Sequence, residues 1–560
     1  MAAHLLATSK LTQSYYHTPS QRRFCGKTIG QLLDLTSDAY PKREAITYYP
    51  KDGDVKRLSF EELRLRVDRF AEGLMKLGVQ KGEKLGILVG RRYEYIVAYL
   101  GVMKAGLVAV RLLTFSKADQ LKYQINKVGC DILVIDSDGL ANIRELLPEV
   151  ECERVPCCRK PLPSVRFFIN IDSAETRGAC LSLKSMLSMS PDHLKEIGFE
   201  NELQLDDPCV IFFSSGSTGR PKAIVHSHRS ISEYVLTMSD YKTSYNDDEH
   251  GCHLCSVTYA VALEYNVAPM IVAGDRFLLT ESQDIDTILS VIRLERCTSM
   301  ILYPLHAFEI AYTKGEGIDL SSLKEVGVGG NVFPLDTLAK LRKFHIQNIT
   351  IGYGATETNA ATSHLKGEPI DEKTWIVGRP IPHCEVKIVD DNFRTVPVDT
   401  EGEVCVRSPY VFQCYFGEEE RTKAVKTESG WVKTGDVGIM LDDGRIRVLG
   451  RKDDCIIKNT RNVYPSEIEC YLFGHSKVKY CQAVAIPDEK VINEIGLCLV
   501  LKPETECNEE EILDVMKKHL DEFLIPKYIL FFESFPVTDT GKIKRTEVMR
   551  MAVERLNLKK

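Results

Sequence analysis

Between residues 59 and 136 the sequence alternates two kinds of segment, and this alternation restricts the fold more than any other feature. Apolar residues that recur every three or four positions predict helices, whereas short apolar runs bounded by glycine or polar residues favour buried strands. Helices are predicted at 59–79, 93–106 and 118–129, and strands at 84–89, 107–110 and 131–136. This order predicts an α/β fold, with parallel-rich sheets flanked by helices.

Three further apolar runs, at 209–213, 299–304 and 348–354, are typical of buried strands. Two of them lead into segments rich in glycine and hydroxyl residues. The 209–213 run is followed by SSGSTGRPK, and the 348–354 run ends within YGATET. In parallel α/β sheets ligands bind beyond the carboxyl ends of the strands. We therefore expect these two segments to contribute to a binding site.

The 560-residue chain is too long for a single hydrophobic core. The composition changes near residue 450, so we expect a large N-terminal domain over 1–452 and a small α+β domain over 453–560. Strands at 480–486 and 496–502 and a helix at 508–524 are predicted in the smaller unit. Asn508 is a favourable N-cap for that helix, and acidic residues follow it in the first turn.

Charge and hydropathy exclude several classes of partner. The formal net charge is −7 and like charges do not form runs, so we expect no nucleic-acid-binding surface. The most apolar long stretch, 259–274, contains Glu264 and Asn266 and is too short and too polar to span a bilayer. The expected partners are small molecules, and the sequence leaves the oligomeric state open.

Cysteine usage bears on the compartment. The 18 cysteines are scattered and the N-terminus lacks the pattern of a signal peptide, which indicates reduced thiols and a cytoplasmic location. A mitochondrial location is the alternative, because residues 1–33 contain basic residues but no Asp or Glu. Cys252 and Cys255 form a single C-x-x-C pair, for which core or loop cysteines are favoured over a zinc site.

Residues 212–226, FFSSGSTGRPKAIVH, place two glycines, several hydroxyl residues and two cations directly after an apolar run. Backbone amides beside glycine, hydroxyl groups and the Lys222 ammonium can all bind a phosphate. The Walker motif is absent, because Gly216 and Gly219 are only three positions apart and Ala223 follows Lys222. The segment is either a phosphate loop of another kind or a solvated Ser/Gly turn between a strand and a helix.

Five motifs occur in order along the chain: SSGSTGRPKA (214–223), YGATET (353–358), KTGDVG (433–438), GRKDDCIIKNTRNVYPSEIE (450–469) and TDTGKIKR (538–545). The series resembles the adenylate-forming superfamily of acyl- and aryl-CoA synthetases, peptide-synthetase adenylation domains and beetle luciferases. The resemblance covers nearly the whole chain. The segments SYYHTPS, INKVGCDILV and IPKYIL are most similar to medium-chain acyl-CoA synthetases.

This resemblance implies a two-step reaction. A carboxylate first attacks the α-phosphate of ATP and expels pyrophosphate, which gives an acyl-adenylate. The thiol of coenzyme A (CoA) then displaces AMP. ATP, Mg²⁺ and CoA are the implied cofactors and co-substrates, and positioned cations and amides should dominate catalysis because both steps move negative charge.

The resemblance also implies roles in ATP binding. The loop over the β- and γ-phosphates would consist of Ser214, Ser215, Gly216, Ser217, Thr218, Gly219, Arg220, Pro221 and Lys222. Tyr353 would stack on adenine, with Gly329 and Gly330 on the opposite side. Thr356 would contact the α-phosphate, and Glu357 would bind Mg²⁺, which is commonly held by one carboxylate together with phosphate oxygens and water.

The remaining implied roles lie toward the C-terminus. Asp436 would accept hydrogen bonds from both ribose hydroxyls, and Arg451 would make a second ribose contact. Asp453 would be the hinge about which a mobile small domain rotates between the two steps. Lys542 would bridge the substrate carboxylate and the α-phosphate, and it joins Thr356 and Glu357 as an expected catalytic residue.

Two positions differ from the family pattern. Most acyl-CoA synthetases have two glycines where this chain has Asn459 and Thr460, followed by Arg461. The resemblance implies that this loop shapes the path of the CoA arm; Asn459 can adopt a left-handed backbone conformation, whereas Thr460 does so only with strain. Tyr259 stands where the acyl pocket of the family often has a histidine.

The leading interpretation is an AMP-forming ligase that joins a carboxylic acid, of the medium-chain fatty acid class, to CoA. One alternative is an adenylating enzyme with another acceptor, or with oxygen as in luciferases. Another is a pseudoenzyme that binds a nucleotide or an acyl group. The retained residues of the five motifs oppose the pseudoenzyme, namely Lys222, Glu357, Asp436, Arg451 and Lys542.

Overall fold

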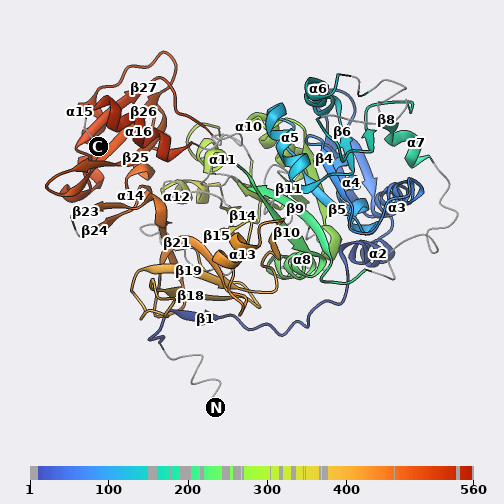
Figure 1. Ribbon diagram of the computed structural model, residues 1–560, viewed down its shortest axis with the longest axis horizontal. Coiled ribbons are helices and arrows are strands. Elements are labelled where there is room, and N and C mark those ends of the chain that lie inside the picture. The colour runs from blue at the N-terminus through green and yellow to red at the C-terminus, as the bar shows by residue number, and fades with distance from the viewer. Residues whose placement is uncertain are drawn as a thin grey trace.

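The computed structural model describes residues 10–148, 150, 161–176, 180–188, 203–214, 220–242, 252–255, 267, 270–302, 304–314, 319–329, 336–344, 346, 348–364, 368, 376–459, 461–473, 475–537 and 543–557. A large α/β part and a smaller C-terminal part lie side by side, as Figure 1 shows. This arrangement confirms the predicted fold class. No helix in the described part of the chain is both long enough and apolar enough to cross a membrane.

The first large sheet follows from the alternating pattern of the N-terminal sequence. Its strands pair in the order β20 (Cys414–Tyr415), β10 (Lys222–Ser227), β9 (Pro208–Ser214), β5 (Val108–Arg111), β4 (Lys84–Leu88), β6 (Ile132–Ile135), β7 (Phe167–Asn170) and β8 (Cys180–Ser182). Pairing is parallel from β9 through β8 and antiparallel at the β9–β10 and β10–β20 edge. The predicted helices and strands between 59 and 136 are present, with ends that shift by at most three residues.

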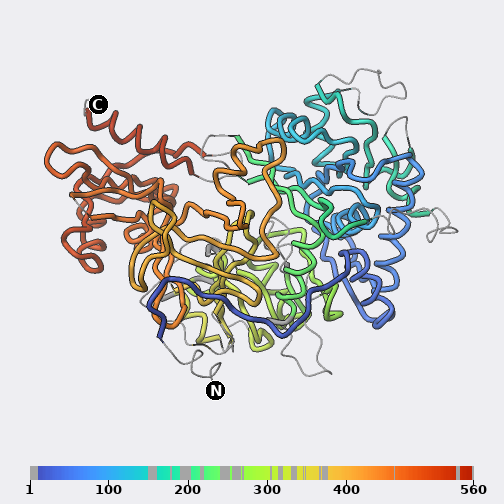
Figure 2. Tube along the Cα trace, turned by 60° about the horizontal axis from the view of Figure 1, so that its bottom comes forward, coloured from blue at the N-terminus to red at the C-terminus, as the bar shows by residue number. Residues whose placement is uncertain are grey.

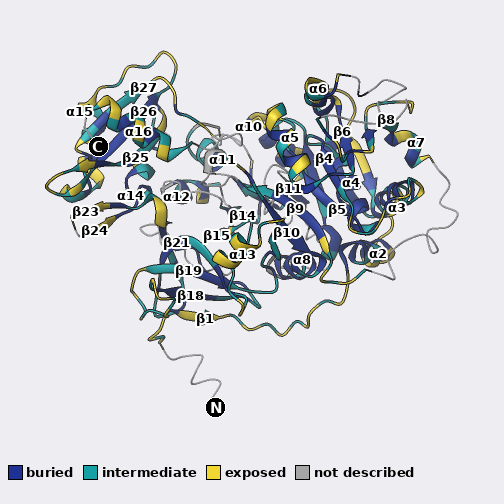
Figure 3. Ribbon diagram, viewed as in Figure 1, coloured by how far each residue is buried: buried dark blue, intermediate teal, exposed yellow. Residues whose placement is uncertain are grey.

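Helices cover both faces of this sheet. The helices α3 (Phe60–Lys76) and α4 (Tyr93–Lys104) share one continuous hydrophobic core with the sheet, while α5 (Ala118–Val128) and α6 (Ser137–Leu146) pack in a second core. Figure 3 shows the strands as almost entirely buried. Because both faces are covered, the strands are continuously apolar rather than alternating, which is why short apolar runs identified them.

The second large sheet is also parallel at its centre. Its order is β17 (Arg379–Pro380), β16 (Asn359–Ser363), β15 (Asn348–Ala355), β14 (Glu325–Val328), β13 (Ser299–Leu302), β11 (Cys252–Cys255), β12 (Arg276–Thr280), β2 (Glu44–Tyr49) and β3 (Lys56–Ser59). Further helices are α2 (Ile29–Ala39), α7 (Leu183–Leu187), α8 (His228–Lys242), α10 (Ile285–Glu295), α11 (Pro304–Glu309), α12 (Asp336–Arg342) and α13 (Glu419–Val425). The predicted C-x-x-C pair lies on β11, and Cys252 is buried.

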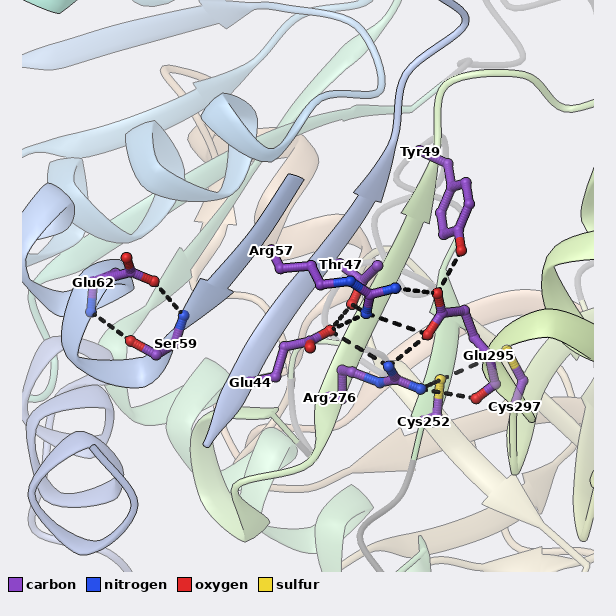
Figure 4. Close-up of polar contacts among 10 residues, drawn as sticks. All are labelled: Glu44, Thr47, Tyr49, Arg57, Ser59, Glu62, Cys252, Arg276, Glu295 and Cys297. Atoms are coloured by element: carbon purple, nitrogen blue, oxygen red, sulfur yellow. Dashed lines mark hydrogen bonds and ion pairs between the residues drawn. The ribbon is translucent and has the colours of Figure 1, made fainter. Parts of the chain in front are cut away.

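A network of charged side chains lies at the β3 edge of the second sheet (Figure 4). The Glu295 carboxylate at the end of α10 pairs with Arg57 of β3 at 2.6 Å and with Arg276 of β12 at 2.6 Å. Glu44 of β2 pairs with Arg57 at 2.9 Å. In the same view, Ser59 and Glu62 form a capping box that begins α3.

The third sheet was not predicted from the sequence. It is antiparallel, in the order β1 (Tyr15–His17), β18 (Glu385–Val389), β19 (Gly402–Arg407), β21 (Val432–Met440) and β22 (Ile446–Arg451). Figure 2 shows the extended N-terminal segment running from β1 across the molecule toward α2. On this path Arg22 forms an ion pair at 3.0 Å with the fully buried Glu233 of α8.

The small C-terminal part has its own sheet and core. The sheet contains β24 (Arg461–Val463), β23 (Ile456–Lys458), β26 (Ile492–Leu501) and β25 (Val478–Asp488), and β27 (Tyr528–Phe532) pairs with β26 in parallel. The helices are α14 (Ser466–Glu469), α15 (Glu509–His519) and α16 (Arg545–Arg555). The predicted helix at 508–524 was too long, because the backbone of Leu520 is extended and ends α15 at His519, although Asn508 is its N-cap as predicted.

Arg545 connects several segments of the small part. Its guanidinium forms a two-pronged ion pair with Glu469 of α14, donates to the carbonyl oxygen of Ala483 at 2.7 Å, and lies 3.5 Å from a carboxylate oxygen of Asp454. Glu469 also accepts a hydrogen bond from the backbone amide of Ala483 at 2.7 Å. Removal of one partner from a largely buried ion pair of this kind is strongly destabilising.

We therefore predict that Arg545→Ala lowers the free energy of unfolding of the small part by about 3 kcal/mol. Native-state hydrogen exchange of the β25 and β26 amides reports on this part separately from the rest of the chain. The matched control is Arg550→Ala, on the same helix, whose pair with Glu554 is exposed and 3.9 Å long. The control should change stability by less than about 1 kcal/mol; equal effects of both variants would contradict the prediction.

Candidate active site

The predicted phosphate loop connects the neighbouring strands β9 and β10. Ser214 at the end of β9 lies opposite Lys222 at the start of β10, and the strands are antiparallel. Ser215, Gly216, Ser217, Thr218 and Gly219 lie outside the described residues. The element that follows the loop is the strand β10 and not a helix, because α8 begins only at His228.

Two cations lie at the start of β10. The Lys222 ammonium is 5.2 Å from the centre of the Tyr415 ring, and the Arg220 guanidinium is 5.2 Å from the centre of the Tyr123 ring. The Tyr123 hydroxyl donates to the carbonyl oxygen of Pro221 at 3.4 Å. Burial lowers the pKa of Lys222, while the charge of Glu357 opposes this shift. A partly desolvated ammonium next to a glycine-rich loop suits the binding of a phosphate.

Thr356 and Glu357 lie on the tight turn between β15 and β16. A side chain at Gly354 would place its Cβ 1.9 Å from the carbonyl oxygen of Asn359, so this turn requires glycine. Asn359 has a φ of 55°, a left-handed conformation that Asn tolerates. The Glu357 carboxylate accepts a hydrogen bond from the Tyr415 hydroxyl at 2.8 Å, and its backbone carbonyl accepts one from the amide of Phe412 at 2.8 Å.

A buried histidine, which the sequence reasoning did not identify, supports this turn. His226 of β10 has no exposed surface, and its Nε2 is 2.8 Å from the carbonyl oxygen of Thr356. Because a carbonyl oxygen only accepts, we assign the hydrogen to Nε2. Burial lowers the pKa of His226 to about 4, so the ring is neutral at physiological pH.

Tyr353, Asp436 and Arg451 form a second cluster, which brings together three of the predicted nucleotide-binding residues. The Tyr353 hydroxyl donates to Asp436 Oδ2 at 2.6 Å, and Arg451 Nε is 2.9 Å from Asp436 Oδ1. Asp436 and Arg451 are register partners on β21 and β22, so the pairing of these strands sets their spacing. Burial raises the pKa of Asp436, opposed by the Arg451 charge and the Tyr353 hydrogen bond.

Gly329 lies beside the strand that carries Tyr353. A Cβ at Gly329 would be 3.3 Å from the carbonyl oxygen of Gly352, so the two backbones approach closely there. Gly330 lies outside the described residues, as does Tyr259, the predicted acyl-pocket residue.

The segment after residue 451 leads into the small part. Asp453 is exposed in a short 3-10 turn, Lys452–Asp454, directly after β22. Asn459 begins the tight connection between β23 and β24, in which Lys458 pairs with Arg461. The φ of Asn459 is 53°, which confirms that it adopts the left-handed conformation. Thr460 lies outside the described residues, and Figure 1 shows the hairpin at the outer margin of the small part, away from β15.

The predicted catalytic Lys542 also lies outside the described residues. The segments on both sides of it are held together: Val537 and Ile543 form an antiparallel bridge, and the amide of Lys544 donates to the carbonyl oxygen of Pro536 at 2.9 Å. Arg545 then begins α16 with the ion pairs described above. The ends of the loop that contains Lys542 are therefore fixed to the small part.

Two family sequence models match the chain. The model for "AMP-binding enzyme" matches residues 33–416, and the model for "AMP-binding enzyme C-terminal domain" matches residues 467–542. The chain belongs to the AMP-binding enzyme family. This confirms the resemblance to the adenylate-forming superfamily that the five motifs carried.

Similar proteins span nearly the full length of this family member. A human protein named medium-chain acyl-CoA ligase ACSF2, mitochondrial, is 28% identical over 97% of this chain and 91% of its own length. A Bacillus subtilis putative acyl-CoA synthetase, YngI, is 26% identical over 95% of this chain and 98% of its own. The amide bond synthetase McbA from Marinactinospora thermotolerans is 25% identical, with a TM-score of 0.78 over 94% of this chain and 99% of its own.

The fold also matches the crystal structure of the anthranilate CoA ligase AuaEII in complex with anthranoyl-AMP. That likeness has a TM-score of 0.81 at 22% identity and covers 95% of this chain and 98% of the other. Adenylate-forming acyl-CoA ligases use ATP, Mg²⁺ and CoA. The Glu357 carboxylate fits the Mg²⁺ requirement, because Mg²⁺ is commonly held by one carboxylate together with phosphate oxygens and water.

The lowered pKa of His226 predicts an acid-dependent loss of stability. The unfolded state takes up a proton near pH 6.5, whereas the folded state does so only near pH 4. His226 therefore contributes stability above pH 6.5 that is lost as the pH falls toward 4, about 2 kcal/mol between pH 7 and pH 5.

The variant His226→Gln keeps an N–H that can reach the Thr356 carbonyl but does not titrate. Urea unfolding of both proteins at pH 7 and pH 5 measures the difference, and the wild type should lose about 2 kcal/mol more than the variant. Parallel pH dependences of the two proteins would show that His226 does not titrate in this way.

Proposed function

We propose that the chain is an AMP-forming acid–CoA ligase that activates a medium-chain carboxylic acid. The observation that carries this proposal is that Tyr353 and Arg451 both contact Asp436, and that Tyr353 lies on β15, the strand that leads into the turn of Glu357. Tyr353 is expected to contact adenine, and Asp436 and Arg451 are expected to contact the ribose. The names of the human and Bacillus relatives support an acyl-CoA product and a place in fatty acid metabolism.

In the first step a carboxylate oxygen of the acid attacks the α-phosphorus of ATP, and the bond to pyrophosphate breaks. Asp436 accepts hydrogen bonds from the ribose hydroxyls, and Lys222 with the 214–222 loop binds the β- and γ-phosphates. Lys542 and Thr356 contact the groups on which charge develops. Glu357 would hold Mg²⁺ together with the phosphates, and the ion would supply charge neutralisation.

In the second step the thiolate sulfur of CoA attacks the acyl carbon, and the bond between that carbon and the AMP oxygen breaks. We propose that the small domain, 453–560, rotates about Asp453 between the steps. The separation of the Asn459 hairpin from β15 supports this proposal, because the hairpin can contribute to the second step only after such a movement (Figure 1).

A second candidate function is transfer of the acyl group to an amine. The amide bond synthetase McbA has the same fold at 25% identity. The chain also has Asn459 and Thr460 where most acyl-CoA synthetases have two glycines. An acceptor other than CoA is therefore kept as an outcome of the tests below.

For the location, the relatives named as mitochondrial support the mitochondrial alternative. Two basic residues of the N-terminal segment have partners in the fold, so their charge does not add support for a mitochondrial presequence. Lys10 pairs with Asp442 at 2.6 Å, and Arg22 pairs with Glu233 at 3.0 Å.

The proposed function is tested by incubating the protein with ATP, Mg²⁺ and acids of increasing chain length, with and without CoA. Pyrophosphate, AMP and thioester are followed separately. We expect pyrophosphate release with medium-chain acids and thioester only when CoA is present. Lys542→Ala should slow acyl-adenylate formation by about 10²–10³-fold, since it removes a contact to developing charge.

The matched control is Lys544→Ala, because Lys544 is the N-cap residue of α16 and its ammonium pairs with Glu547 of that helix at 3.3 Å. It should retain near wild-type rates. Adenylation by Lys542→Ala at the rate of the control would contradict the role of Lys542. Product formation with an amine but not with CoA would favour the second candidate function.

We further predict that Asn459→Gly with Thr460→Gly speeds acyl transfer to CoA without changing pyrophosphate release in its absence. The physical reason is that side-chain bulk at this hairpin narrows the path of the thiol, whereas adenylation uses the opposite face of the small domain. Single-turnover kinetics from supplied acyl-adenylate measure the second step alone. A slower second step in the variant would instead identify Asn459, Thr460 and Arg461 as contacts to CoA.

A further inference from the structure

Tyr415, which none of the five motifs contains, lies between two predicted phosphate-site residues. It ends β20 and is buried, with 3% of its surface exposed. Its hydroxyl donates to Glu357 Oε1 at 2.8 Å, and the Lys222 ammonium is 5.2 Å from the centre of its ring. The one side chain therefore contacts the expected Mg²⁺ ligand and the expected phosphate-binding cation.

The backbone around Tyr415 is fixed from two sides. Tyr415 is the register partner of Ile224 on β10, and the next amide, of Phe416, donates to the carbonyl oxygen of Ala223 at 2.8 Å. The amide of Tyr415 donates to the Thr422 hydroxyl at 3.0 Å. These bonds leave the tyrosine little freedom to move relative to the strand that carries Lys222.

The turn that carries Glu357 is tied to the same segment. The amide of Phe412 donates to the backbone carbonyl of Glu357, and the Phe412 ring packs 4.9 Å from the Tyr415 ring, centre to centre. The side-chain bond and the backbone bond thus fix Glu357 at two points. Among the described residues, no hydrogen bond is made by the second carboxylate oxygen, Oε2.

The chemistry of the tyrosine suits a permanent donor. The Glu357 carboxylate can only accept, so the Tyr415 phenol is the donor in the 2.8 Å bond between them. A hydrogen bond from a neutral donor to a carboxylate is of the stronger, charge-assisted kind. The face of the ring attracts the Lys222 ammonium, and this attraction increases where water is excluded.

We propose that Tyr415 is a positioning residue that orients the Glu357 carboxylate toward Mg²⁺ and holds Lys222 at the base of the phosphate loop. The metal ligand and the phosphate cation then form a single preorganised site for Mg²⁺-ATP. This inference rests on the roles given to Glu357 and Lys222 in the proposed function. Residues that orient a metal ligand typically change metal affinity by about 10–100-fold when they are replaced.

The test separates the hydroxyl from the ring. Tyr415→Phe keeps the ring beside Lys222 and removes the bond to Glu357, whereas Tyr415→Leu removes both. The matched control is Tyr410→Phe, because Tyr410 is a buried tyrosine in the same segment whose hydroxyl bonds to Thr237 and Pro382 instead. ATP binding is measured by calorimetry with Mg²⁺ and with a chelator, so the readout does not depend on the identity of the acid.

We expect Tyr415→Phe to weaken ATP binding about tenfold with Mg²⁺ and little with the chelator. Tyr415→Leu should weaken binding in both conditions, and Tyr410→Phe in neither. In a Glu357→Gln background, Tyr415→Phe should have no further effect, because the carboxylate that it orients is gone.

Equal losses for Tyr415→Phe with and without Mg²⁺, or a loss matched by Tyr410→Phe, would overturn the inference and leave a structural role. Wild-type ATP binding that does not respond to Mg²⁺ would overturn it as well. Failure of the proposed function is a different result: Mg²⁺-ATP binds as expected and the three variants behave as stated, but no acid in the panel causes pyrophosphate release.

Discussion

The hydrogen bond between Tyr353 and Asp436 joins two separate sheets. Tyr353 lies on β15 of the second parallel sheet, and Asp436 lies on β21 of the antiparallel sheet. Their 2.6 Å hydrogen bond, together with the Arg451 ion pair, fixes the distance between these sheets. The first sheet reaches the same place through β10 and β20, which carry Lys222 and Tyr415. The site is therefore the meeting point of three sheets.

This site buries an acidic and a basic side chain, and burial disfavours the charged form of each. Asp436 is buried and its pKa is raised by that burial, so its ionised form depends on the donors and charge that face it. Lys222 is partly desolvated, and its pKa is lowered for the same reason. In the proposed function a nucleotide would bring ribose donors to Asp436 and phosphate charge to Lys222. Its binding would then relieve both unfavourable states, which would be a physical reason for selectivity toward a complete nucleotide.

The sequence predicted the parts of the fold that depend on local pattern. The helices and strands between residues 59 and 136 are correct because each has its own periodicity or apolar run. The antiparallel sheet was missed, since strands such as Val432–Met440 contain Thr434, Gly435 and Asp436 and are not continuously apolar. The helix predicted over 508–524 was too long. Its amphipathic pattern continues past Leu520, where the backbone leaves the helix.

Prediction of the site was limited in a different way. Motifs identified Tyr353, Asp436 and Arg451, which the structure brings into contact. His226 and Tyr415 were not identified, because their importance lies in bonds to Thr356 and Glu357, more than 50 residues away in the chain. The histidine directly after AIV in the β10 strand was the available signal, since a buried polar side chain requires a partner.

The N-terminal segment limits how the protein can be matured by proteolysis. Ser14 is fully buried, and the three residues after it form β1, which pairs with β18. Arg22 is the cation that faces the buried Glu233 carboxylate, which also accepts a hydrogen bond from the backbone amide of Cys25. A peptidase that cleaved after residue 27 would remove a strand and leave that carboxylate uncompensated, at a cost of about 3–5 kcal/mol. A cut before Ser14 would keep both β1 and the Arg22–Glu233 ion pair.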